Sequence, residues 1–433
     1  PGRSLMTQPL PAPLPVSVRG GSSGITADCE AMVALAARFG AVGEDTLGAA
    51  LSLHGYLAAP TVVSSSVFDP VGFARFELEL LSALDGWRGL SWAGVECGAL
   101  DAELRLAAAA YEGVDRVSSR VQDVVLGALT AGPALTAGAA ALAATGNPLS
   151  AAEAVVARDP QLADVVVTAL GVPALLTTIG KRVPDGHGVL RRARVDRRGV
   201  AGRPPRRLTD VLRDLSQRNG DAAHGEIDVR ILTMPDGSRR AIVDITGTKS
   251  WDPLPTHDIT SLTTNGRALV GERTAYEDGV LAAMRRAGVR RSDKVMLVGH
   301  SEGGMVAVTT ARDASASGEF DVTHVVTAGS PIGHTAVSLP RRVQLLALEN
   351  SRDVVPHLDG VANPDRPNVT TVSSPRGDGT VLGDHDIDGS YVPVAADVAA
   401  SRNGSVRDFL AGAKTYFQAT GVETHTYQVQ RRY

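Results

Sequence analysis

The chain has 433 residues, with 43 Lys and Arg against 47 Asp and Glu and a formal net charge of −4. At 43% hydrophobic and 21% charged residues, the composition excludes a mainly disordered protein and leaves room for two or three globular domains. The weak negative charge gives no reason to expect nucleic acid, and two cysteines, Cys29 and Cys97, exclude a disulfide framework and a zinc site built from four cysteines.

Residues 1–25 are rich in Pro, Gly and Ser and lack the continuous apolar core of a secretory signal. We expect a disordered N-terminal segment or a tag here, and no cleavable signal peptide. The protein would then be cytoplasmic or be exported by a leaderless route.

Residues 26–180 are dominated by Ala, Leu, Val and Glu at helical spacing, which predicts an all-α domain. The pair Asp69-Pro70 is typical of a helix start, because Pro suits the first turn. The apolar run 126–144 is rich in Ala and Gly and contains Pro133, so a buried helical hairpin is favoured over a membrane span.

A Trp-x-Gly turn at Trp87–Gly89 separates two predicted helices, and Tyr111 and Asp115 follow. Over residues 68–118 this arrangement resembles the helical-hairpin substrates of type VII secretion. The resemblance implies leaderless export and a helical partner for this domain. Packing of Trp87 and Tyr111 in a helical core is the alternative.

Residues 181–207 hold ten Lys and Arg but only two acidic residues, together with the pair Pro204-Pro205. Such a stretch is typical of an exposed basic linker. A solvated connection is the simpler interpretation, and contact with an anionic membrane or cell envelope is the alternative.

Residues 208–433 alternate between apolar runs suited to strands and helical stretches, which predicts an α/β domain with a mostly parallel sheet. The segment Met234–Ser238 supplies the turn of an opening hairpin. The predicted strands are 227–233, 241–246, 294–298, 324–327, 343–348 and 369–372, and the predicted helices are 274–287, 304–316 and 393–400.

The strongest motif of the chain is Gly-x-Ser-x-Gly, formed by Gly299, His300, Ser301, Glu302 and Gly303 between a predicted buried strand and a helix. In that context the glycines permit a tight strand-to-helix turn that lifts the serine hydroxyl clear of the sheet. The motif predicts a nucleophilic Ser301.

A serine nucleophile needs a base and an acid that orients the base, in the chain order Ser, acid, His. Asp353 follows the predicted strand 343–348 and is favoured over Glu349, which lies at the strand end. Three histidines follow Asp353, and His385 is favoured as the base. His357 lies too close to Asp353 in the chain, and His425 lies in a predicted edge strand, 422–429.

An oxyanion site needs two donors. We expect one to be the backbone N–H of Glu302, and the other to come from the loop after strand 241–246, where Gly247 allows a bend and Thr248 offers its N–H and its hydroxyl. A plain turn is the alternative for this loop.

Four motifs in this order resemble the lipase-like α/β-hydrolases, in particular class 3 lipases and the hydrolases attached to mycobacterial-type secreted proteins. They are Gly247–Trp251, Gly299–Gly304, Val326–Gly333, and Asn350–Pro356 followed by His385 and Tyr391. The resemblance covers residues 208–433. It implies a triad of Ser301, Asp353 and His385, with Thr248 and Glu302 around the oxyanion.

The sequence therefore predicts a serine hydrolase that cleaves a carboxylic ester, lipid or short acyl, through an acyl-serine intermediate. An acyltransferase or thioesterase would use the same residues, and an interaction protein with a vestigial hydrolase half is the alternative from another class. We expect no metal and no cofactor. The stretch 251–273 is a candidate lid or acyl-pocket wall.

Overall fold

The computed structural model describes residues 12–22, 29–85, 89–111, 163–169, 172–182, 184–196, 203–220, 224–249 and 257–433. Its contacts divide the chain into two compact units. One is Thr26–Thr130, and the other combines Pro1–Ile25 with Ala131–Tyr433. The boundary between the two units therefore lies before the basic segment and not within it.

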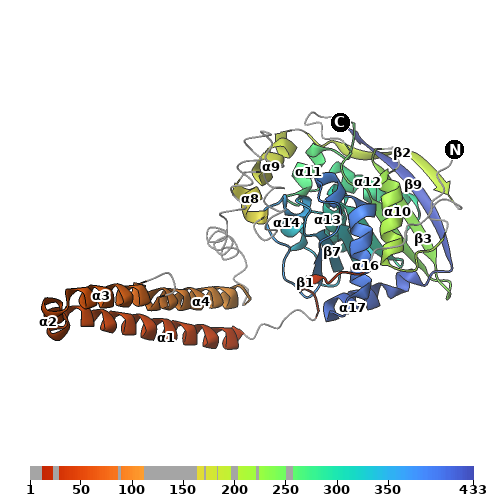
Figure 1. The fold of residues 1–433 in the computed structure, drawn as a ribbon. Helices are drawn as coiled ribbons and strands as arrows, with labels where there is room; N and C mark the ends of the chain where they lie inside the picture. The colour runs from red at the N-terminus through yellow and green to blue at the C-terminus, as the bar shows by residue number, and fades with distance from the viewer. Residues whose placement is uncertain are drawn as a thin grey trace. The chain divides into compact units, whose positions relative to one another are not determined.

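The first unit is helical in its described part (Figure 1). Its elements are α1 (Cys29–His54), η1 (Gly55–Ala58), α2 (Pro60–Phe68), α3 (Pro70–Asp85) and α4 (Leu90–Tyr111). Helix α3 starts at Pro70 as predicted, and Asp69 caps it, because its Oδ1 accepts a hydrogen bond of 2.9 Å from the N–H of Gly72.

Helices α1 and α4 pack against each other through small residues. A Cβ placed on Gly43 would lie 2.9 Å from the carbonyl oxygen of Gly94, so larger side chains would force the helices apart. Cys97 in α4 is a free thiol. The Trp87 and Asp115 positions of the Trp-x-Gly pattern and the apolar run 126–144 lie outside the described residues.

Within the described residues no single helix is both long and apolar enough to span a membrane. The bent helix pair Leu35–Leu57 and Pro60–Ser66 meets the same criteria of length and composition when its two parts are taken together.

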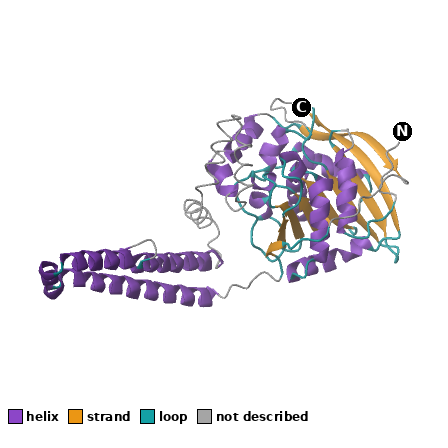
Figure 2. Ribbon diagram, viewed as in Figure 1, coloured by secondary structure: helices purple, strands orange, loops and turns teal. Residues whose placement is uncertain are grey.

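The second unit is built on one nine-stranded sheet with the order β1-β8-β7-β6-β5-β4-β3-β9-β2. Figure 2 shows strands of this sheet together with the helices of the unit. Strands β4 to β8 run parallel, and the strands outside this block pair antiparallel. The strands are β1 (Ser17–Gly20), β2 (His187–Asp196), β3 (Glu226–Thr233), β4 (Arg239–Ile245), β5 (Lys294–His300), β6 (Asp321–Ala328), β7 (Gln344–Asn350), β8 (Val369–Ser374) and β9 (Gly421–Arg432). This is the predicted α/β-hydrolase-like fold with a mostly parallel central sheet.

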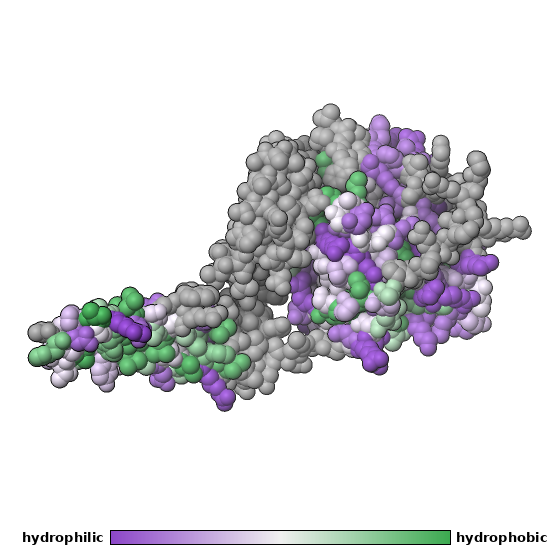
Figure 3. Space-filling model, in the orientation of Figure 1, coloured by the Kyte–Doolittle hydropathy of each residue, from purple (hydrophilic) through white to green (hydrophobic). Residues whose placement is uncertain are grey.

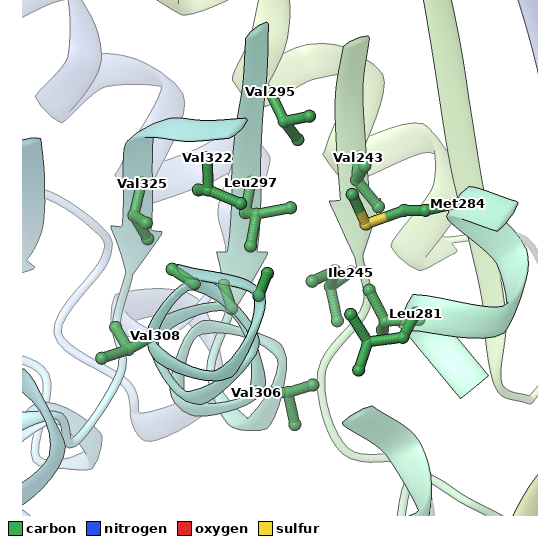
Figure 4. Close-up of a cluster of buried hydrophobic side chains, with 14 of the residues drawn as sticks. Val243, Ile245, Leu281, Met284, Val295, Leu297, Val306, Val308, Val322 and Val325 are labelled. Atoms are coloured by element: carbon green, nitrogen blue, oxygen red, sulfur yellow. The ribbon is translucent and has the colours of Figure 1, made fainter. Parts of the chain in front are cut away.

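Alternate residues of each strand point to opposite faces of the sheet, and both faces are buried. In β5, Val295 and Leu297 pack into one apolar cluster, and Met296 and Val298 pack into the other. Figure 4 shows part of the first cluster, where Leu281 and Met284 of α12 and Val306 and Val308 of α13 meet the strands.

Helices α11, α12 and α13 cover the first face, and α10, α16 and α17 cover the second. The helices of this unit are α8 (Ala163–Ala169), α9 (Val172–Arg182), α10 (Leu208–Gly220), α11 (Leu262–Ala268), α12 (Ala275–Arg286), α13 (Glu302–Ser317), α14 (Gly333–Ala336), α15 (Val381–Asp384), α16 (Val392–Ala400) and α17 (Gly404–Ala413). Short turns of helix are η3 (Val355–His357), η4 (Ile387–Tyr391) and η5 (Lys414–Phe417).

Three sequence-based expectations differ from the structure. Residues 17–20, expected to be disordered, pair with β8 as an edge strand. Residues 187–196, expected in a basic linker, form β2 and pair with β9. Strand β9 is consequently an interior strand between β3 and β2, and not an edge. In each case the strand forms through backbone hydrogen bonds to a distant partner, which local composition does not reveal.

Candidate active site

The Gly-x-Ser-x-Gly motif forms a sharp turn at the carboxyl end of β5, which lies between the parallel strands β4 and β6. Ser301 stands at this turn with φ 55° and ψ −124°, and it is the one residue other than glycine with a positive φ in the described part of the chain. Such a backbone costs about 1–3 kcal/mol and persists where its surroundings enforce it. Functional sites are where such strain concentrates.

The glycines around Ser301 are required by close contacts. A Cβ on Gly299 would lie 2.1 Å from the carbonyl oxygen of Gly303, and one on Gly303 would lie 2.2 Å from that of Ile245. A Cβ on Gly304 would lie 2.0 Å from Oγ of Ser330. Any larger residue at these three positions would push the turn away from the sheet.

Asp353 and His385 form a hydrogen-bonded pair. Asp353 lies in the loop after β7 with a fully buried side chain, and its Oδ2 is 2.6 Å from Nδ1 of His385. Its Oδ1 accepts a hydrogen bond of 2.9 Å from the N–H of Val355, which fixes the carboxylate. Because Nδ1 holds its proton toward Asp353, Nε2 is the ring nitrogen available as a base.

Tyr391 gives Asp353 a third hydrogen bond. Its buried hydroxyl donates to the same Oδ2 at 2.5 Å. Burial and the nearby charge of Asp353 raise the pKa of Tyr391 well above its ordinary value, so the hydroxyl stays a donor. Gly329 makes room for this ring, since a Cβ there would lie 2.7 Å from the Tyr391 oxygen.

His300 connects His385 to the serine turn. Its Nε2 lies 2.9 Å from the carbonyl oxygen of His385, and the two rings lie 4.5 Å apart between centroids. Burial lowers the pKa of His300 well below 6.5, so the ring is neutral, with its proton on Nε2 facing that carbonyl. The residue just before Ser301 therefore holds the backbone of His385 in place.

The loop after β4 lies directly against the turn. A Cβ on Gly247 would be 2.9 Å from the carbonyl oxygen of His300 and 3.0 Å from Cβ of Ser301. The Thr248 hydroxyl donates to Oε2 of Glu302 at 3.0 Å and accepts from Nδ2 of Asn265 at 2.8 Å. The expected hydroxyl donor for an oxyanion is therefore engaged by Glu302, and the N–H is the donor that Thr248 can offer.

The competing residues have other partners. His357 pairs with Asp164 through Nδ1 at 2.7 Å, and Glu349 accepts from Asn363 at 2.6 Å. His425 lies 3.3 Å from Glu423 on β9. Each of the three is thus held by a neighbour of its own.

The candidate lid, 251–273, is described from residue 257 onward, and Trp251 and Leu254 lie outside the described residues. The described part is anchored in the core. Arg431, which is fully buried, donates to the Asp258 carbonyl oxygen and to the hydroxyls of Ser261 and Thr264. These hydrogen bonds tie residues 258–264 to β9.

Sequence reasoning did not find the roles of Asn219 and Asn265, which hold the loop after β4. Asn219 accepts the N–H of Gly247 through Oδ1 at 3.2 Å, and Asn265 binds Thr248. Neither lies in a motif, so no local signal pointed to them. Among the described residues no group of three or more His, Cys, Asp or Glu is arranged to hold a metal ion.

Residues 262–386 match the family model described as PGAP1-like alpha/beta domain. The matched span is less than a third of the chain, runs from α11 to the residue after His385, and includes Ser301 and Asp353. It supports a hydrolase-like α/β domain. No curated protein and no solved structure matches the chain.

Proposed function

We propose that this protein is a serine hydrolase that cleaves carboxylic esters, of lipids or short acyl groups, with Ser301, His385 and Asp353 as its triad. The observation that carries the proposal is the buried Asp353–His385 pair, tied by His300 to a strained serine turn. The likeness of residues 262–386 to a hydrolase-like α/β domain agrees with it.

In the first half-reaction the Ser301 hydroxyl attacks the ester carbonyl while Nε2 of His385 takes its proton. Asp353 stabilises the imidazolium through Nδ1. The carbonyl oxygen becomes an oxyanion, which the N–H groups of Glu302 and Thr248 are suited to bind. Glu302 begins α13, so its N–H has no acceptor within the helix. Collapse of the intermediate expels the alcohol, protonated by His385, and leaves acyl-Ser301.

In the second half-reaction His385 removes a proton from water, which attacks the acyl-serine, and a second oxyanion forms at the same donors. Its collapse releases the carboxylic acid and returns the proton to Ser301. An alcohol in place of water would make the same residues an acyltransferase, and a thioester in place of the ester would make them a thioesterase.

The test is covalent labelling with a fluorophosphonate probe, followed by turnover of p-nitrophenyl esters of graded chain length. We expect the probe to modify Ser301 and the esters to be hydrolysed by the wild type but not by Ser301→Ala. Hydrolysis that survives in Ser301→Ala would overturn the proposal. A folded wild type that neither reacts with the probe nor turns over any ester would favour the vestigial-hydrolase alternative.

A further inference from the structure

Glu302 carries a buried acid directly after the candidate nucleophile. The residue is 1% exposed, its Oε2 is bonded to the Thr248 hydroxyl, and its Oε1 has no hydrogen-bond partner among the described residues. A buried carboxylate with an unpartnered oxygen is costly, so the acid is more stable protonated. Consistently, burial raises the pKa of Glu302 well above 4.5.

The Thr248 hydroxyl needs a hydrogen-bond acceptor, and the Glu302 carboxyl provides it. Nδ2 of Asn265, from α11, can only donate, so Thr248 Oγ1 must be the acceptor of that bond and must direct its own proton elsewhere. Oε2 of Glu302 accepts the hydrogen bond that the Thr248 hydroxyl donates. The three side chains thus form one chain of hydrogen bonds from α11 through the loop after β4 to the start of α13.

We propose that the Glu302 side chain is a positioning residue of the oxyanion site, which fixes Thr248 to α13 so that the two backbone N–H donors keep the separation an oxyanion requires. This inference rests on the proposed function. The side chain acts through Thr248 and does not itself touch the substrate. Because the two donors bind charge that develops only in the transition state, loosening them lowers kcat and leaves KM nearly unchanged.

The experiment compares variants that remove or keep the acceptor. Glu302→Leu removes it at similar volume, and Glu302→Gln keeps a neutral oxygen that can accept from Thr248. Thr248→Val removes the hydroxyl and keeps the backbone N–H, and Thr248→Ser keeps both. We expect Glu302→Leu and Thr248→Val each to lower kcat by about 10- to 100-fold, with KM changed less than about 2-fold, and the Gln and Ser variants to recover most of the loss.

Because both changes break the same link, the double variant Glu302→Leu with Thr248→Val should be scarcely slower than either single one. Glu277 provides the matched control. It is another fully buried glutamate, in α12, and burial together with the neighbouring Asp313 raises its pKa to about 8. Glu277→Leu tests the general cost of removing a buried acid and should leave kcat unchanged in the folded fraction.

Multiplying losses in the double variant, or a wild-type kcat in Glu302→Leu, would overturn the inference. Such a result with Ser301 still labelled by the probe would leave the proposed function intact, whereas absence of Ser301-dependent turnover in the wild type would remove both. Thermal unfolding identifies variants that fail to fold. If Glu302→Leu is among them, the Thr248→Val and Thr248→Ser pair decides, and equal kcat in these two would overturn the inference.

Discussion

At the scale of single residues, the candidate site is defined by how many hydrogen bonds converge on Asp353. His385 and Tyr391 share its Oδ2, and the N–H of Val355 binds its Oδ1. A fully buried carboxylate is stable only when its oxygens are paired in this way. The same bonds offset the cost of burying Asp353 and set the orientation of the His385 ring.

The first prediction concerns the triad as one unit. We expect Ser301→Ala and His385→Ala each to lower kcat by on the order of 10⁴-fold, and Asp353→Ala to be milder. The double Ser301→Ala, His385→Ala variant should cost little more than either single change. Steady-state hydrolysis of an active p-nitrophenyl ester measures this, with His357→Ala as the matched histidine control that keeps most activity. Inactive His357→Ala beside active His385→Ala would reverse the assignment of the base.

The second prediction concerns Tyr391. Removing its hydroxyl in Tyr391→Phe leaves Oδ2 of Asp353 with one donor fewer, so the carboxylate and the His385 ring that it orients are held less firmly. We expect kcat to fall by roughly 3- to 30-fold, with the ring still filling its site. Steady-state hydrolysis of a p-nitrophenyl ester measures this. An unchanged kcat in a folded variant would show that Tyr391 contributes packing alone.

At the scale of elements, α8 is fixed to the acid loop. Val167 of α8 packs with Val354 and Leu358, and Asp164 pairs with His357 of η3. Burial alone would lower the pKa of His357, but the hydrogen bond and charge of Asp164, with the charges of Glu349 and Asp353, raise it to about 9. The pair therefore carries charge at neutral pH and couples α8 to the loop that holds Asp353.

The third prediction follows from the sign of that shift. A histidine whose pKa rises from 6.5 to about 9 on folding adds stability that is fully present below pH 6.5 and is lost as the pH rises through about 9. We expect Asp164→Asn to lower the free energy of unfolding by roughly 1–3 kcal/mol at pH 6 and by much less at pH 10. Urea unfolding of both proteins at the two pH values measures the difference. An equal loss at both would contradict the ion pair.

The fourth prediction concerns β2. Its arginines lie in the segment whose composition predicted an exposed linker, yet the strand pairs with β9 along its length. Backbone held in a sheet resists proteases, because cleavage requires local unfolding. We expect limited trypsin digestion to spare the bonds after Arg191, Arg192 and Arg194 until the sheet unfolds, as read by mass spectrometry. Early cleavage at these arginines would support the linker interpretation instead.

At the scale of the whole molecule, the two units differ in how far their apolar side chains are exposed. The second unit buries them on both faces of its sheet, whereas the described helical unit exposes many. Figure 3 shows apolar residues over its surface, and Leu51, Phe68, Val71 and Leu78 are each more than 70% exposed. Exposed apolar surface of this kind is typical of interaction sites. A helical partner for this unit stays a prediction.

The sequence alone predicted the α/β architecture, the hairpin and the serine turn, because each has a local signature. Each signature lies within a short stretch of sequence. They are the alternation of apolar and polar residues in strands, the Gly and Pro residues at turns, and the Gly-x-Ser-x-Gly spacing. Chain order and loop position also singled out Asp353 and His385, which the structure brings within hydrogen-bond distance.

Tertiary structure alone decided what depends on partners distant in the chain. The pairing of β1 with β8 and of β2 with β9 joins segments more than 200 residues apart, and no local pattern encodes a backbone partner at that range. The Asn265–Thr248–Glu302 chain and the Asp164–His357 pair likewise join side chains of separate elements. Hydrogen bonding in a buried site depends on three-dimensional proximity, and packing of the complete sheet and its helices is what creates that proximity.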